Sequence, residues 1–119
     1  MHINESAENY LETILLLSKT KPVVRSVDIA DELGFKKSSV SVAMKNLREK
    51  EHITVTREGF IYLTDTGKAI AEMIFERHKL LTQWLDRLGV SPDTASEDAC
   101  KIEHVISQES FEAIKKHIQ

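Results

Sequence analysis

The hydrophobic pattern of this chain changes its period over one short segment, and that change constrains the fold more than any other feature. Between residues 5 and 50, apolar residues recur every three or four positions, which is the spacing of helices. Between residues 52 and 63, apolar and polar residues alternate around Arg57-Glu58-Gly59. This alternation predicts a β-hairpin with the glycine in its turn. After residue 64 the helical spacing returns.

Three helices are predicted before the hairpin. The first covers residues 5–19, and the second follows Ser26 and stops at Gly34, because glycine suits the backbone at a helix C-terminus. The third begins at Lys37 or Ser38 and buries one apolar face. Two helices with a short glycine-containing connection, followed by a hairpin, are arranged in the order of a winged helix-turn-helix. In that fold the second helix of the pair enters the major groove of DNA.

The remainder of the chain predicts a second, helical domain. A long helix starts near Thr64-Asp65-Thr66-Gly67, carries an apolar stripe, and stops at Gly89 and Pro92. A loop over residues 91–96, a helix through residues 100–104 and a final helix over residues 111–118 should follow. A long helix with one apolar face packs on other helices, often those of a second subunit.

The predicted fold class is therefore mainly α, with two domains. Residues 1–70 form the winged helix-turn-helix, with three helices plus a β-hairpin wing, and residues 71–119 form an α-helical dimerisation domain of a homodimer. A chain of 119 residues is long enough for two such small lobes.

Composition favours a cytoplasmic protein. Its one cysteine, Cys100, cannot form an internal disulfide, which fits a reducing compartment. No apolar run is long enough to cross a bilayer, and the N-terminus does not resemble a signal peptide. We therefore expect no membrane partner.

Basic residues are concentrated in the third helix, although the whole chain has a net charge of −3. Such a stripe can be a solvated helix face. Its place in a helix-turn-helix followed by a wing instead favours binding to double-stranded operator DNA. We expect basic residues to contact phosphates and small residues near the helix start to face base edges. The candidates are Lys36, Lys37, Ser38, Ser39, Ser41, Val42, Lys45 and Arg57.

Cys100, Glu103 and His104 place three types of metal ligand within one turn of a predicted helix. The apolar residues Ile102, Val105 and Ile106 are expected to point away from these ligands, toward a core. A thiolate, a carboxylate and an imidazole together suit Fe²⁺, Mn²⁺, Co²⁺, Ni²⁺ or Zn²⁺.

The spacing of these residues is also compatible with roles that do not involve a metal ion. His78 lies on the apolar side of the long helix, where a lone histidine is more often a core or interface residue. Taken by itself, Glu12 is most often a solvated carboxylate. Cys100 taken by itself is most often a small buried apolar residue. The protein could thus be a winged-helix regulator that needs no metal, with Cys100, Glu103 and His104 structural.

An enzyme is the less favoured reading. The sequence offers no separate nucleophile or general base, and the chain has little room for a substrate pocket. We therefore expect no small organic substrate.

Dispersed segments, in order and in register, match one known pattern. They are Ser6-Ala7-Glu8-Asn9-Tyr10-Leu11-Glu12-Thr13-Ile14, Ser38-Ser39-Val40-Ser41, Leu63-Thr64-Asp65-Thr66-Gly67-Lys68, Glu76-Arg77-His78-Lys79-Leu80-Leu81 and Glu97 to Ser107. Together they resemble the diphtheria-toxin-repressor family of metal-dependent transcriptional repressors, in its compact two-domain form. The resemblance covers nearly the whole chain.

The resemblance implies a repressor of metal-homeostasis genes that a divalent metal ion, Fe²⁺ or Mn²⁺ in the cell, activates for operator binding. Co²⁺, Ni²⁺ and Zn²⁺ are expected to bind in vitro. Glu12 and His78 are similar to the manganese-responsive branch of the family, whereas Cys100 is similar to the iron-responsive branch. The metal ligands that it implies are Asn9, Glu12, His78, Cys100, Glu103 and His104.

Overall fold

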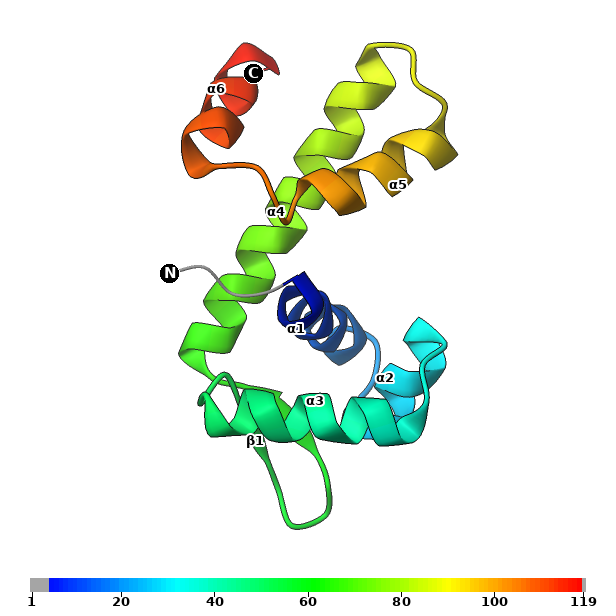
Figure 1. Cartoon of the computed structure of the whole chain (residues 1–119), viewed down its shortest axis with the longest axis vertical. Helices are drawn as coiled ribbons and strands as arrows, with labels where there is room; N and C mark the ends of the chain where they lie inside the picture. Colours follow the sequence, from blue (N-terminus) through cyan, green and yellow to red (C-terminus); the bar gives the residue numbers. More distant parts are fainter. Residues whose placement is uncertain (1–4, 119) are drawn as a thin grey trace. The chain divides into compact units, whose positions relative to one another are not determined.

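The computed structural model describes residues 5–118 and forms, over that range, six helices and one two-stranded antiparallel sheet (Figure 1). The chain divides into two compact units, Met1–Glu72 and Met73–Gln119. The predicted fold class, a winged helix-turn-helix followed by a helical domain, is confirmed. No helix within residues 5–118 is both long and apolar enough to span a membrane.

The first unit is built on three helices: α1 (Glu5–Ser18), α2 (Ser26–Leu33) and α3 (Lys37–Glu49). Each helix contacts the other two. Their core contains Leu11, Ile29 and Val40, one fully buried residue from each helix. Gly34 ends α2 as predicted, with φ +70° and with its N–H donating to the Ala30 carbonyl at 2.9 Å. The apolar spacing and the glycine stop therefore produce the helix-turn-helix.

The wing is the hairpin of β1 (Ile53–Val55) and β2 (Ile61–Leu63), in which Thr54 pairs with Tyr62. Gly59 adopts φ +88° in the turn, and its N–H donates to the Thr56 carbonyl at 2.9 Å. The N–H of Ile61 donates to the Val24 carbonyl at 2.8 Å. This bond ties the wing to the segment that leads into α2, so the wing and the helix pair form one body.

The helix α4 (Asp65–Arg87) begins at the base of the wing, where the backbone at Gly67 lies very close to the backbone of His52. The N–H of Thr64 donates to the His52 carbonyl at 3.1 Å, and the His52 Nδ1 lies 3.1 Å from the Thr66 hydroxyl oxygen. A Cβ added to Gly67 would overlap the carbonyl oxygen of His52. Glycine is therefore required at residue 67 by this close approach.

The second unit contains the C-terminal part of α4, α5 (Pro92–Ile102) and α6 (Gln108–Ile118). The predicted loop over residues 91–96 is wrong, because Pro92 is the first residue of α5. Proline stops a preceding helix but is favoured at the first position of the next, where its missing N–H is not needed. Within this unit, Lys115 and Glu76 join α6 to α4 through an ion pair of 2.8 Å.

Candidate metal centre and nucleic-acid interface

Glu103 is the centre of the candidate metal site in the second unit. Its side chain is 0% exposed, and its Oε1 lies 2.8 Å from Nδ1 of His78 on α4. Its Oε2 lies 3.8 Å from Nε2 of the buried His104. A buried carboxylate thus lies between two imidazoles. These oxygen and nitrogen donors fit Mn²⁺, Fe²⁺ and similar ions, which accept both kinds of ligand.

The backbone that carries Glu103 and His104 is a turn and not the predicted helix. α5 ends at Ile102, while Glu103 keeps right-handed helical angles and donates its N–H to the Ala99 carbonyl at 2.9 Å. His104 and Val105 continue the turn. Buried residues still recur every four positions at Ala95, Ala99 and Glu103, so the side of this segment that carries Glu103 is the buried side.

The prediction of a ligand face opposite a packing face is therefore wrong. Val105, which was expected in the core, is 77% exposed, and Ile102 and Ile106 are only partly buried. Glu103 and His104 are buried instead. Cys100 is exposed on α5.

Arg77 is a residue of this site that the sequence reasoning did not single out. Its buried guanidinium donates from Nη1 to the carbonyls of Glu103 at 3.1 Å and Ile106 at 2.9 Å. Its Nη2 donates to Oε1 of Gln108 at 2.9 Å, and the group lies over the Phe111 ring, 5.5 Å from its centroid. The available signal was an arginine on the apolar side of a long helix, one residue before His78.

The remaining predicted ligands, Asn9 and Glu12, belong to α1 in the first unit and are partly buried. The backbone carbonyl of Asn9 accepts a hydrogen bond from the Thr13 hydroxyl at 2.8 Å. Across residues 5–118 no three or more His, Cys, Asp or Glu side chains are already arranged as a group that could hold a metal ion, so the structure shows the pairs Glu103–His78 and Glu103–His104 and not a complete site. Of the predicted ligands, the contacts above join Glu103 with His78 and His104.

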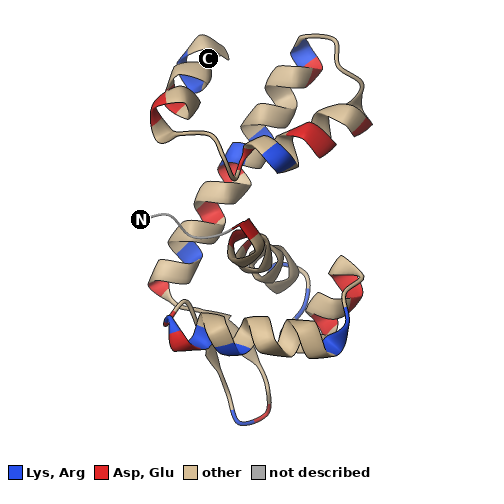
Figure 2. Cartoon of the chain, in the orientation of Figure 1, with Lys and Arg blue, Asp and Glu red and all other residues tan. Residues whose placement is uncertain are grey.

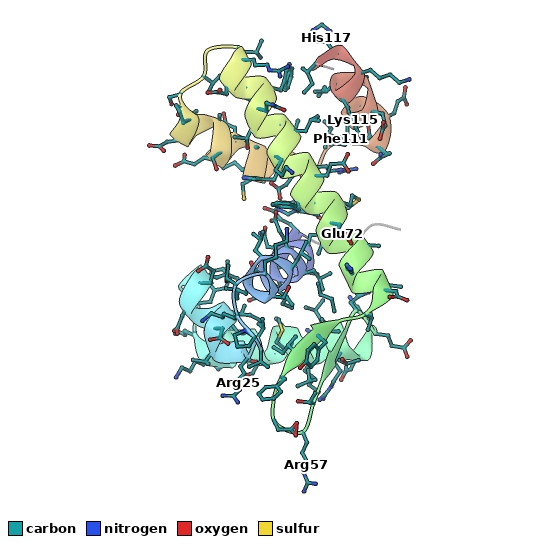
Figure 3. All side chains as sticks on the ribbon, turned by 180° about the vertical axis from the view of Figure 1, so that it is seen from behind. Arg25, Arg57, Glu72, Phe111, Lys115 and His117 are labelled. Atoms are coloured by element: carbon teal, nitrogen blue, oxygen red, sulfur yellow. The ribbon has the colours of Figure 1, made fainter. Side chains whose placement is uncertain are left out.

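The predicted DNA contacts share one exposed surface of the first unit. α3 buries Val40, Met44 and Leu47, so its opposite side faces outward. Figure 2 shows lysines and arginines along α3 and at the tip of the wing, and Figure 3 shows Arg57 projecting from that tip. The exposed candidates are Lys36, Lys37, Ser38, Ser39, Ser41, Val42, Lys45 and Arg57.

A groove of about 200 Å³ lies between α3 and strand β1 of the wing, and its lining adds Arg48 to the basic residues of this surface. Lys45 and Arg48 line it together with Ser26, Ser41, Met44 and Val55. Arg25 lies beside the wing with its guanidinium 4.7 Å from the centroid of the Phe60 ring (Figure 3). The sequence reasoning missed Arg25, which is distant in sequence from the basic stripe and joins it only through the fold.

Comparison with known families accounts for nearly the whole chain. Residues 2–59 match the family model described as iron dependent repressor, N-terminal DNA binding domain. Residues 64–119 match the model described as iron dependent repressor, metal binding and dimerisation domain. The chain is also 35% identical, over 96% of its length and 80% of theirs, to proteins of Listeria monocytogenes and Listeria innocua named HTH-type transcriptional regulator MntR.

Solved structures of metal-dependent regulators share this fold. The manganese regulator SloR is 26% identical and superposes with a TM-score of 0.82 over 99% of this chain and 54% of its own. A manganese-dependent transcriptional repressor in complex with manganese is also 26% identical, with a TM-score of 0.84 over 93% of this chain and 51% of its own. The chain therefore spans about half the length of these two proteins. It belongs to the family of iron-dependent repressors, which are metal-dependent transcriptional regulators with a DNA-binding domain and a metal-binding and dimerisation domain.

Proposed function

We propose that the chain acts in the cytoplasm as a homodimeric repressor, and not as an enzyme, whose operator binding requires Mn²⁺ or Fe²⁺ at a site built on Glu103. The observation that carries this proposal is the buried Glu103 carboxylate between the imidazoles of His78 and His104. A carboxylate and two imidazoles close together, away from water, are groups that a divalent ion can bind. Glu103, His78 and His104 would hold such an ion, which would add positive charge beside the carboxylate.

We propose that Cys100, Glu12 and Asn9 complete the ligand set. Glu103, His78 and His104 offer three donor groups, whereas Mn²⁺ and Fe²⁺ accept more. Cys100 belongs to the same unit as Glu103, and Glu12 and Asn9 belong to the other. The softer thiolate of Cys100 favours iron, while the carboxylate of Glu12 favours manganese. In functional terms we assign residues 1–70 to DNA binding and residues 71–119 to metal binding and dimerisation.

The proposed coupling follows from where these ligands lie in the chain. Ligands from both units can share one ion only in a particular placement of the DNA-binding unit, so binding selects that placement. In a homodimer this sets the spacing between the two copies of α3 to match two half-sites. An allosteric coupling of about 1–3 kcal/mol would raise operator affinity roughly five- to 150-fold.

On the DNA itself, the basic residues of α3, its groove and the wing contact phosphates. This role belongs to the predicted residues Lys36, Lys37, Lys45 and Arg57. We include Arg48 and Arg25 because Arg48 lines the groove beside α3 and Arg25 lies against the wing. Ser38, Ser39, Ser41 and Val42 face the base edges. Phosphate contacts position the protein, whereas the contacts of these small residues carry the sequence preference.

The proposal is tested by measuring operator binding at buffered free Mn²⁺ and, without oxygen, at buffered free Fe²⁺. The operator is first selected from random DNA with the metal-loaded protein. We expect tight binding that chelator abolishes, and we expect Glu103→Gln to remove the metal response. Glu109→Gln, an exposed change on α6, is the matched control and should respond like the wild type.

A different result would support the rival regulator. If the chelated wild-type protein binds DNA as tightly as the metal-loaded protein, the chain needs no metal and Cys100, Glu103 and His104 are structural. If Glu103→Gln still responds to metal, the assigned ligands are wrong.

A further inference from the structure

We infer that Arg77 is a positioning residue for the metal site, because its guanidinium holds the turn on which the Glu103 carboxylate is presented to His78. The inference rests on the proposed function, since it concerns the same metal centre. Arg77 and His78 are consecutive on α4, and both contact Glu103. The guanidinium binds its backbone carbonyl at 3.1 Å, and the imidazole lies 2.8 Å from its carboxylate.

The chemistry of this guanidinium suits the end of a helix. The last carbonyls of a helix have no partner within the helix and carry partial negative charge. Arg77 is 7% exposed and directs one nitrogen, Nη1, at the carbonyl of Glu103, the residue after α5 ends, and at that of Ile106, in the segment that leads to α6. A cation at this position is therefore stabilised by the α5 terminus, and in return it closes the turn.

The turn that carries Glu103 and His104 begins where α5 ends, at Ile102. Beyond Ile102, the N–H groups of Val105 and Ile106 both donate to the Ile102 carbonyl, at 3.0 Å each. The carbonyls of Glu103 and Ile106 instead accept from Arg77. The backbone of Glu103 is thus held from α4, one residue away from the imidazole that its carboxylate meets.

The same guanidinium also connects the ligand turn to α6. Its Nη2 donates to the Gln108 side chain at the first position of α6, and its face lies on the ring of the buried Phe111. Arg77 therefore joins α4, the ligand turn and α6 in one cluster. A change at Arg77 should displace the Glu103 carboxylate without removing any ligand atom.

The test compares metal binding by the wild type, Arg77→Lys, Gln108→Ala and Lys115→Met. Lysine keeps the positive charge but lacks the planar fork that reaches both carbonyls and Gln108. Gln108→Ala removes one partner of the guanidinium and leaves Arg77 in place. Lys115→Met is the matched control, since it breaks another α4–α6 contact, the ion pair with Glu76, and leaves the arginine cluster intact.

We expect Arg77→Lys to lower Mn²⁺ affinity in calorimetry by roughly 10- to 100-fold, the usual effect of removing a partner that orients a ligand. The visible absorption spectrum of the Co²⁺-loaded variant should also change, because the ligand geometry changes. Gln108→Ala should show a smaller loss in the same direction. Lys115→Met should match the wild type in both measurements.

Wild-type affinity and an unchanged Co²⁺ spectrum in Arg77→Lys would overturn the inference, provided that Glu103→Gln abolishes binding. An equal loss in Lys115→Met would also overturn it, because the effect would then come from loosening α6. If Arg77→Lys does not fold, Gln108→Ala decides, and wild-type binding by that variant would count against the role of Arg77. Failure of the wild-type protein to bind metal would instead refute the proposed function itself.

Discussion

His78 and Glu103 are 25 positions apart in the sequence, yet Nδ1 of the histidine lies 2.8 Å from Oε1 of the glutamate. α4 supplies the imidazole, and the turn after α5 supplies the carboxylate. The glutamate is fully buried, whereas the histidine side chain is 30% exposed. Of the two, His78 can therefore be truncated with less damage to packing, which makes it the better probe of the site.

Replacement of His78 by alanine should lower Mn²⁺ affinity by more than about 100-fold, since outer partners of metal ligands alone contribute 10- to 100-fold. Isothermal titration calorimetry measures this directly, and thermal unfolding of the metal-free protein reports whether the fold persists. His117→Ala, at an exposed histidine near the end of α6, is the control and should bind like the wild type. Equal affinities in the two variants would contradict the role of His78.

Substitution of Gly67 by alanine should destabilise the DNA-binding unit. The added Cβ would overlap the His52 carbonyl oxygen, and that oxygen is held by the Thr64 N–H at the start of α4. Overpacking of this kind typically costs about 1–3 kcal/mol. Urea denaturation measures the loss, with Lys68→Ala as an exposed control in the same helical turn. A variant as stable as the wild type would show that the backbone can move apart there.

Removal of Arg57 from the wing tip should weaken binding to all DNA sequences alike. A phosphate contact releases counterions, so its loss should reduce the slope of log affinity against log salt concentration by about 0.9. Fluorescence anisotropy over a range of salt concentrations gives that slope for Arg57→Ala and Lys45→Ala. Lys116→Ala, an exposed change in the second unit, should leave the slope unaltered. Unchanged slopes in all three variants would contradict the proposed phosphate contacts.

Val42 is 61% exposed on α3 and is suited to contact a thymine methyl group. Burial of one methyl-sized group contributes about 0.8 kcal/mol, or roughly fourfold in affinity. Replacement of individual operator thymines by uracil should therefore weaken the wild-type protein at one position and leave Val42→Ala unaffected there. If every uracil substitution affects both proteins equally, Val42 does not read a methyl group.

The ion pair between Lys115 and Glu76 should make stability depend on alkaline pH. The hydrogen bond and charge of Glu76 raise the pKa of Lys115 above its ordinary value of 10.5. Because the folded pKa is raised, the stabilisation is fully present below 10.5 and is lost as the pH rises through the folded pKa. The difference in melting temperature between the wild type and Glu76→Gln should shrink across this range. A difference that stays constant would show that the pair does not titrate.

The helix-turn-helix and the wing were predictable because their signals are local. Gly34 ends α2 through its own backbone angle, and the alternation around Gly59 pairs residues within one hairpin. The prediction of a loop over residues 91–96 was wrong because proline is found both after the end of a helix and at the first position of a helix, and the sequence alone does not distinguish the two. Pro92 follows one helix, which indicated a stop, yet it occupies the first position of the next.

The chemical types of the candidate ligands could be read from the sequence, but the placement of Glu103 and His104 in the structure could not. Helical spacing placed Cys100, Glu103 and His104 on one face, but α5 ends at Ile102, so Cys100 lies on the helix while Glu103 and His104 lie in the turn after it. Burial then reversed the expected pattern, with Glu103 inside and Val105 outside. The bonds from Arg77 to the carbonyls of this turn come from another helix, so no pattern within residues 97–107 could reveal them.

By itself, the sequence determined the order of the elements, the basic face of α3 and the chemical types of the candidate ligands, because hydrophobic period, turn residues and side-chain chemistry act over a few neighbouring positions. Only the tertiary structure decided that Glu103 contacts His78, that Arg77 binds the backbone carbonyl of Glu103, and that Arg25 lies against the wing. Those relationships join residues on separate elements, and the packing of the elements, more than their local pattern, sets the distances between them.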